Sequence, residues 1–412
     1  MTIHLFQRRI ERRTLLKAGL ALGALNLVDP LGRAARAASG QRSGHASRGT
    51  IKIGNIMPYS GPASAYATIG KTEAAYFDMV NANGGINGRR IDFISYDDGY
   101  SPPKAVEQAR RLVEDDGVLL IFNSLGTPSN SAIERYMNEK KVPQLFVATG
   151  ATKWNDPRHF PWTMGWQPSY QSEARVYAKY LLRHHPKGRI AILYQNDDYG
   201  RAYLTAMTDE MKGTPASIVA SEAFNITDPT IDSQIVKLAD TKADVLLIGA
   251  TARQTIQTLK KTAELKWKPQ IFIAYPAANI ERTYKVAGVD LAKGVISSSV
   301  FKDPSDPAVA NDKDVKDYFA FMAKYYPAGD RLDTLNVAAY VEGEIMAETL
   351  RRTGKDLSHK TFLAKATTLA GFKPPMLRES VVVRTEPSNY TIFRSMQLLQ
   401  FDGKENKAIA TP

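Results

Sequence analysis

Short apolar runs alternate with longer amphipathic segments from residue 50 onward. In the first half of the chain, β-branched and aromatic residues predict strands at 51–57, 90–96, 118–122 and 144–148. Apolar residues at helical spacing predict helices near 64–83, 102–115 and 128–140. Strands that alternate with helices in this way are typical of a parallel sheet with helices on its faces.

A second series of the same kind follows. The pattern predicts strands at 189–194, 216–224, 244–248, 270–274 and 294–299, and helices near 170–185, 199–212, 231–240 and 252–265. Helices near 311–325 and 334–353 then precede a closing strand at 396–401. Because the apolar stripes of these late helices need a sheet to cover, we expect them to return to the first sheet.

The fold class that follows is α/β, with two doubly wound parallel-sheet lobes. A Pro- and Trp-rich passage at 159–168 lacks any period and indicates a crossing between lobes. We expect three crossings, near 163–170, 297–303 and 375–390. The resulting lobes are 50–165 plus 302–378, and 166–301 plus 379–412. Such sheets bind ligands at the carboxyl ends of their strands, which predicts a cleft between the lobes.

The first 37 residues have the composition of an export signal. A basic segment with Arg12 and Arg13 resembles the twin-arginine signal, an apolar stretch covers 18–28, and Ala-Arg-Ala at 35–37 suits cleavage. An amphipathic helix of a cytoplasmic protein is the alternative, but it would interleave polar residues through 18–28. We therefore expect a periplasmic protein with a flexible lead-in at 38–49.

Charge and composition narrow the function classes. The net charge is +12, but residues 1–37 hold seven basic against two acidic residues, and the other Lys and Arg are scattered. A phosphate-binding stripe, and hence a nucleic-acid partner, is not expected. The chain has no cysteine, which excludes disulfides and thiolate sites. No apolar run of about 18 residues is present, which argues against a multi-span membrane protein.

Several motifs carry a family likeness from about residue 51 to residue 403. They are Ser-Gly-Pro at 60–62 with Tyr66, Asn-Gly-Gly-Ile-Asn-Gly at 83–88, Tyr-Asp-Asp at 96–98, Asn-Asp-Asp-Tyr-Gly at 196–200 and Thr-Glu-Pro-Ser-Asn-Tyr at 385–390. In order and spacing the chain resembles type I periplasmic solute-binding proteins of the branched-chain amino acid (leucine/isoleucine/valine-binding) class. The resemblance implies a monomeric venus flytrap that passes a small solute to an inner-membrane ABC permease, without a cofactor.

Two loops supply candidate ligand contacts. The loop at 123–129 follows a strand and opens a helix, so its free N–H groups suit an anionic or carbonyl oxygen, and the loop at 149–152 adds a second hydroxyl. Helix capping is an equally good explanation for each threonine. The resemblance implies that these loops hold a ligand carboxylate and that tyrosines cover the ligand from both lobes. The residues concerned are Leu125, Gly126, Thr127, Thr149, Gly150, Tyr66 and Tyr199.

One departure from the family pattern bears on the ligand. Amino acid binders of this family carry an acid after the fourth strand of the second lobe, where this chain has Tyr275 and Pro276 in the segment 273–279. Glu281 is several residues away and is expected on the next helix. Thr251 replaces an aromatic residue of the family. Because a buried ammonium without a carboxylate partner costs several kcal/mol, we expect a solute that lacks an amino group, such as an aromatic or aliphatic carboxylate.

A search for catalytic motifs favours a non-enzymatic protein. Gly-Lys-Thr at 70–72 imitates a P-loop but lies inside a helical pattern, and the paired histidines at 184–185 end a helix without further metal ligands nearby. The paired aspartates at 97–98 and 197–198 suit turns. No nucleophile elbow or dinucleotide fingerprint is present. A ligand-sensing module that reports to a membrane protein and a periplasmic hydrolase are the alternatives.

Overall fold

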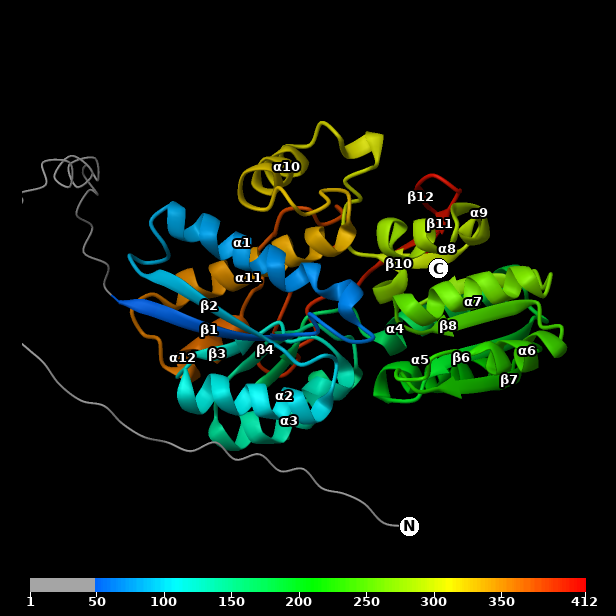
Figure 1. Ribbon diagram of the computed structural model, residues 1–412, viewed down its shortest axis with the longest axis horizontal. Coiled ribbons are helices and arrows are strands. Elements are labelled where there is room, and N and C mark those ends of the chain that lie inside the picture. Colours follow the sequence, from blue (N-terminus) through cyan, green and yellow to red (C-terminus); the bar gives the residue numbers. More distant parts are fainter. Residues whose placement is uncertain (1–48) are drawn as a thin grey trace, which may run out of the picture. The chain divides into compact units, whose positions relative to one another are not determined.

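The computed structural model describes residues 49–412 (Figure 1). The expected export signal at 1–37 and all but the last residue of the expected lead-in at 38–49 lie outside the described residues. Within residues 49–412, no helix has the length and apolar character needed to cross a membrane.

The first lobe is built on a five-stranded parallel sheet with the order β2-β1-β3-β4-β5. Most of its strand residues are apolar, and β3 and β4 are buried along their whole length, as expected for strands covered on both faces. The strands are β1 (Thr50–Met57), β2 (Arg90–Asp97), β3 (Leu120–Phe122), β4 (Gln144–Val147) and β5 (Thr163–Gly165).

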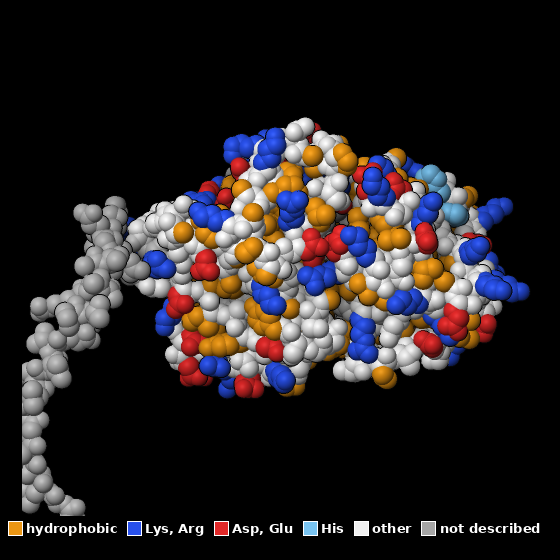
Figure 2. Space-filling view, turned by 45° about the horizontal axis from the view of Figure 1, so that its top comes forward, with side chains coloured by type: hydrophobic (Ala, Val, Ile, Leu, Met, Phe, Trp, Pro, Cys, Tyr) orange, Lys and Arg blue, Asp and Glu red, His pale blue; other side chains and the backbone are white. Residues whose placement is uncertain are grey.

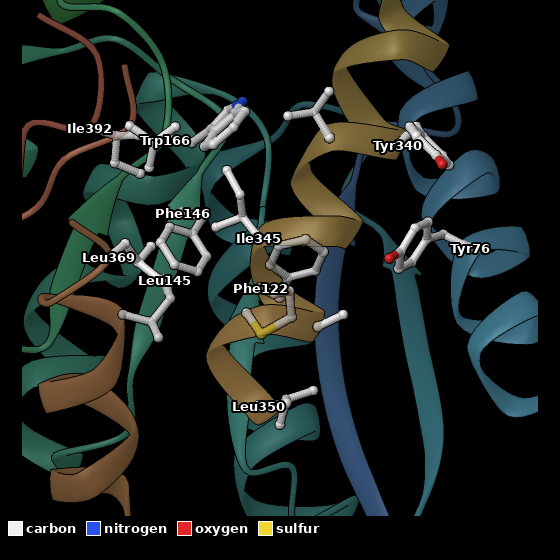
Figure 3. Packing of buried hydrophobic residues seen from close by; sticks show 14 of the residues in the cluster. Tyr76, Phe122, Leu145, Phe146, Trp166, Tyr340, Ile345, Leu350, Leu369 and Ile392 are labelled. Carbon is white, nitrogen blue, oxygen red and sulfur yellow. The ribbon is translucent and has the colours of Figure 1, made fainter. Parts of the chain in front are cut away.

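Helices cover both faces of this sheet. On one face lie α1 (Thr68–Ala82), α10 (Lys313–Tyr325), α11 (Thr334–Thr353) and α12 (His359–Ala366). On the other face lie α2 (Pro102–Arg110), which continues as a π-helical turn (Arg111–Asp115), and α3 (Thr127–Lys140). Figure 3 shows the core under α11, where the rings of Tyr76 and Tyr340 meet edge to face with centroids 5.6 Å apart. Residues far apart in sequence thus share one core.

The second lobe contains a seven-stranded sheet with the order β12-β11-β10-β9-β8-β6-β7. Its strands are parallel up to β10, whereas β11 and β12 run antiparallel to their neighbours. The strands are β6 (Arg189–Gln195), β7 (Ser217–Phe224), β8 (Val245–Gly249), β9 (Gln270–Ile273), β10 (Ile296–Ser299), β11 (Gln397–Phe401) and β12 (Asn406–Ala408). One face carries α4 (Tyr170–His184) and α5 (Asp198–Met211), and the other carries α6 (Asp232–Asp240), α7 (Ala252–Glu264), α8 (Lys285–Ala287) and α9 (Val289–Ala292).

Every strand predicted from the sequence is present within two residues at each end, and the two-lobed α/β class is confirmed. Several short elements were not predicted, among them β5, β12, α8, α9 and α12. β5 has only three residues and lies inside the passage predicted to be irregular. Short strands such as β5 and β12 form because a neighbouring strand supplies their hydrogen bonds, and this leaves no period in the sequence. The antiparallel closing strands also differ from the parallel sheet that was expected.

The third crossing lies later in the chain than predicted. The sequence placed it at 375–390 and assigned 379–412 to the second lobe. In the structure Val381, Val383 and Ile392 pack in the core of the first lobe, and the chain joins the second sheet only at β11. Burial of these three side chains against α12 and its surroundings explains the difference.

Charges are mixed on the surface. On the face drawn in Figure 2, Lys and Arg side chains alternate with Asp and Glu side chains, and the basic residues do not gather into one stripe. This distribution agrees with the scattered charges in the sequence of residues 49–412.

Candidate functional site

A hollow lies where the carboxyl ends of strands from the two sheets face one another. Its empty volume is about 1060 Å³, open solvent included. Aromatic side chains dominate its wall, and they come from both lobes and from the crossing between them. They are Tyr66, Tyr100, Trp166, Tyr170, Tyr199, Tyr275 and Phe301.

The loop between β3 and α3 reaches the hollow as the sequence predicted. Leu125, Gly126 and Thr127 all line it. The amide of Leu125 donates to the carbonyl of Ile56 at 3.0 Å, which ties the loop to the end of β1. Gly126 has φ of +102°, and a Cβ there would lie 2.5 Å from the ring of Tyr100. Only glycine therefore lets the chain turn into α3 against this ring.

Thr149 and Gly150 do not line the hollow, although the sequence placed them beside the ligand. The hydroxyl of Thr149 lies 2.5 Å from that of Thr127 and accepts from Trp154 Nε1 at 3.2 Å. A Cβ on Gly150 would lie 2.3 Å from the carbonyl oxygen of Pro168 and 2.8 Å from the ring of Tyr170. Glycine is therefore required at position 150 because Pro168 and Tyr170, which belong to the first crossing between the lobes, lie against it. Both residues instead border a smaller depression next to it.

Tyr66 and Tyr199 line the hollow from opposite lobes, where the sequence placed them. Tyr66 Oη accepts from the amide of Ala252 at 3.1 Å, a contact from the first lobe to the start of α7. Tyr199 Oη donates to the carbonyl of Ala250 at 2.8 Å. Asp197 caps α5 by accepting from the amide of Tyr199 at 2.9 Å, which fixes the first turn of that helix. Burial raises the pKa of both tyrosines, so their hydroxyls remain protonated at neutral pH.

Thr251, Tyr275 and Pro276 also line the hollow. Thr251 Oγ1 donates to Gln254 Oε1 at 2.8 Å at the start of α7. Tyr275 Oη is buried and has no hydrogen-bond partner among the described residues. Glu281 pairs with Lys285 at 2.7 Å and does not line the hollow, which agrees with its expected position on the next helix.

Many residues of the wall were not found from the sequence, and four of them carry groups that bear on the ligand. The ring of Tyr170 packs against that of Tyr199 at an angle of 58° with centroids 4.7 Å apart, and burial raises the pKa of Tyr170 to about 12. Arg378, Asp303 and Glu342 bring ionisable groups to the hollow. For Glu342 a signal existed, because an acid within the apolar stripe of a helix indicates a buried carboxyl group. Arg378 and Asp303 lie in the crossings between the lobes. The sequence has no local pattern that shows where these crossings run relative to the hollow.

Glu342 belongs to a pair of buried carboxyl groups. Glu73 of α1 and Glu342 of α11 both accept from the same atom, Asn123 Nδ2. Burial raises the pKa of each well above the usual range for glutamate, and the charge of Glu342 raises that of Glu73 further. The pair therefore favours a neutral, protonated form. In the described part of the chain, no group of three or more His, Asp or Glu side chains is placed to hold a metal ion.

A second contact between the lobes surrounds Asp333, which is fully buried. Its Oδ2 lies 2.6 Å from Arg282 Nε, and its Oδ1 accepts from Asn279 Nδ2 at 2.8 Å. Asp333 also caps α11 by accepting from the amide of Leu335 at 3.0 Å. Because Asn279 and Arg282 belong to the second lobe, these bonds hold the two lobes together on one side of the hollow.

Replacing Arg282 by methionine is expected to favour an open form, because it removes the interlobe ion pair but leaves the helix cap of Asp333 intact. A charge-assisted hydrogen bond contributes about 1.5–3 kcal/mol, so the ratio of closed to open form should fall about tenfold or more. Small-angle scattering of the unliganded protein should show a larger radius of gyration. Lys285→Met, on the same segment but paired within its own lobe, serves as the control. Equal radii for R282M and wild type would contradict this role.

Comparison with known proteins places the chain in a family. The profile of the periplasmic binding protein family matches residues 50–406. The Leu/Ile/Val-binding protein of Escherichia coli is 24% identical over 248 residues, which are 60% of this chain and 66% of that protein. The aligned part thus spans just under two thirds of that relative's length.

Solved structures show the same fold at low sequence identity. A branched-chain amino acid ABC transporter protein from Thermus thermophilus with bound valine superimposes with a TM-score of 0.79 at 16% identity, covering 88% of this chain and 96% of that one. A fatty acid ABC transporter substrate-binding protein from Thermomonospora curvata gives 0.73 at 20% identity, covering 90% and 94%. The family match extends from β1 to β12 and includes every residue of the hollow, and we conclude that the chain belongs to the periplasmic binding protein family.

Proposed function

We propose that the protein is the solute-binding component of an ABC importer, and that it captures a carboxylate without an amino group, with an aromatic or aliphatic body. It would act in the periplasm and deliver the solute to a permease in the inner membrane. Its relatives support the transport role, since they are named as binding proteins and transporter components. One of those names is that of a fatty acid transporter protein, so the fold is compatible with ligands that have no ammonium group.

The observation that carries the ligand class is the loop after β9. Where the family resemblance places an acid for the ammonium of an amino acid, this loop presents a phenol and a proline, Tyr275 and Pro276, to the hollow. The two acids on the wall are engaged elsewhere. Glu342 accepts a hydrogen bond from Asn123 Nδ2 and favours its neutral form. Asp303 Oδ1 accepts from the amide and the hydroxyl of Ser305 at 2.9 and 2.6 Å. A buried ammonium would therefore have no carboxylate of its own, because Glu342 favours its neutral form and the charge of Asp303 already acts on the guanidinium of Arg378; the cost is several kcal/mol.

The wall suits the body of such a solute. Rings of Tyr170, Tyr199 and Tyr275 lie side by side, with centroid distances from Tyr170 of 4.7 and 6.1 Å. Flat apolar groups pack well against aromatic faces, and each buried CH₂ group contributes about 0.8 kcal/mol. Closure of the two lobes would then bury the guest and create the form that a permease recognises.

Matched pairs of solutes test this proposal. We expect 3-phenylpropanoate or 4-methylpentanoate to raise the melting temperature of the purified protein, and phenylalanine or leucine, which add only the amine, to leave it unchanged. At a ligand concentration of about 100 Kd the stabilisation is about 2.7 kcal/mol, which corresponds to several degrees. Calorimetric titration then gives the affinity. Tighter binding of leucine than of 4-methylpentanoate would refute the ligand class, and conversion of a solute into products would favour a hydrolase.

A further inference from the structure

The second and third crossings hold an arginine against the hollow. The amide of Arg378 donates to the carbonyl of Val300 at 3.0 Å, and the neighbouring residue Leu377 forms an antiparallel bridge with Phe301. These bonds fix the backbone of Arg378 beside the end of β10. Its side chain lines the hollow together with Phe301 and Asp303. A cation is thus placed at the end of the hollow nearest the crossings.

The buried Nε atom of the Arg378 guanidinium has no hydrogen-bond partner among the described residues. Burial lowers the pKa of Arg378 although the charges of Asp303 and Asp306 oppose that shift. Arg378 is half-buried, and a buried N–H group without an acceptor is unfavourable, so its Nε offers a donor to an incoming acceptor.

Two further wall residues have buried polar atoms without partners in the same described region: Tyr275 Oη and Asn406 Oδ1. Tyr275 belongs to the second lobe and offers a hydroxyl donor. The amide of Asn406 in β12 can present either its oxygen or its nitrogen. Donors from the crossing and from the second lobe therefore face one hollow, and a carboxylate has two oxygens that could accept from them.

The two hydroxyls of the loops to which the family resemblance assigns the carboxylate already have partners. The hydroxyls of Thr127 and Thr149 bond to each other at 2.5 Å, and Thr149 also accepts from Trp154 Nε1. The ring of Tyr170 packs over Gly150, where a Cβ would lie 2.8 Å from it. In this chain the position beside Thr149 and Gly150 is filled by its own side chains.

We propose that Arg378 binds the carboxylate of the solute at the crossing end of the hollow, with Tyr275 Oη as a second donor. This inference rests on the proposed function. Arginine forms strong charge-assisted hydrogen bonds with carboxylates, often with two N–H groups. The nearby charges of Asp303 and Asp306 repel a second negative group, so the site selects monocarboxylates over dicarboxylates.

The test compares 3-phenylpropanoate with its amide, 3-phenylpropanamide, by calorimetric titration. Wild type should prefer the carboxylate by about 10- to 100-fold, the range of one charge-assisted hydrogen-bonded contact. R378M should lose this preference and bind the amide within about threefold of wild type. Arg384→Met, an exposed arginine of the same segment that pairs with Glu386, is the matched control and should behave as wild type.

Two additional variants keep the inference falsifiable if R378M folds poorly. Tyr275→Phe removes only the hydroxyl and should weaken carboxylate binding about 3- to 10-fold with an unchanged melting temperature of the free protein. Thr127→Val tests the loop that the family resemblance favours. If T127V loses the carboxylate preference while R378M and Y275F keep it, the inference is wrong and the proposed function stands. If wild type binds neither compound nor any other monocarboxylate, the proposed function itself fails.

Discussion

Replacing Glu173 by alanine is expected to lower the free energy of unfolding by about 3–5 kcal/mol, because several buried donors each lose their acceptor, at about 1–3 kcal/mol apiece. Glu173 of α4 is fully buried and accepts from Tyr177 Oη at 2.6 Å, from Tyr203 Oη, from Ser298 Oγ and from the amide of Tyr275 at 3.2 Å. These donors come from α4, α5, β10 and the loop after β9. Urea unfolding at equilibrium measures the loss.

The reason for the large effect is that most of these donors have no second acceptor nearby. Tyr177 Oη can still donate to the carbonyl of Ile273 at 2.9 Å, but the other donors would be left buried and unpaired. Two of them, Ser298 and Tyr275, also line the hollow, so solute affinity should fall with stability. Glu264→Ala, at an exposed position of α7, should change the free energy of unfolding by less than about 0.5 kcal/mol. A loss below 1 kcal/mol for E173A would contradict the role of Glu173.

The sequence was sufficient for the architecture because parallel strands covered on both faces are continuous apolar runs. β8 shows this, since all of its five residues are buried and its position was predicted within one residue. β12 could not be predicted, because its three residues include two exposed side chains and it forms only by pairing with β11. The assignment of residues 381–393 to the second lobe was wrong for a similar reason. Isolated valines in a sequence do not show whether they pack in the core of the first lobe or in that of the second.

For the site, residues at strand ends could be predicted and residues in crossings could not. Gly126, Thr127 and Tyr199 reach the hollow because the carboxyl ends of parallel strands meet at one edge. Thr149 follows the same rule, yet its hydroxyl turns to Thr127 and Trp154. Arg378 reaches the hollow through a bridge with a segment more than seventy residues earlier, and no local pattern records such a pairing.

The buried pair Glu73 and Glu342 makes the stability of the protein depend on pH. Because burial raises the pKa of both groups, the folded state keeps protons that the unfolded chain releases above about pH 4.3, the ordinary glutamate pKa. The stabilisation is complete below that pH and is lost as the pH rises through the folded pKa values. Each such group lowers the free energy of unfolding by up to about 1.4 kcal/mol per pH unit in this window.

Glu342→Gln should therefore become more stable relative to wild type as the pH rises. Glutamine has the shape of the protonated acid and carries no charge to bury, and its presence also removes the charge that raises the pKa of Glu73. Between pH 5.5 and pH 8, we expect the difference in free energy of unfolding to move by about 1–2 kcal/mol in favour of E342Q. Urea unfolding at both pH values measures it, with the exposed Glu107→Gln of α2 as a control that should follow wild type. Asn123 Nδ2 donates to both carboxyl groups and so holds them close together, which is why the charge of one raises the pKa of the other. If wild type and E342Q showed parallel pH profiles of stability, the ionisation of Glu342 would not be linked to folding.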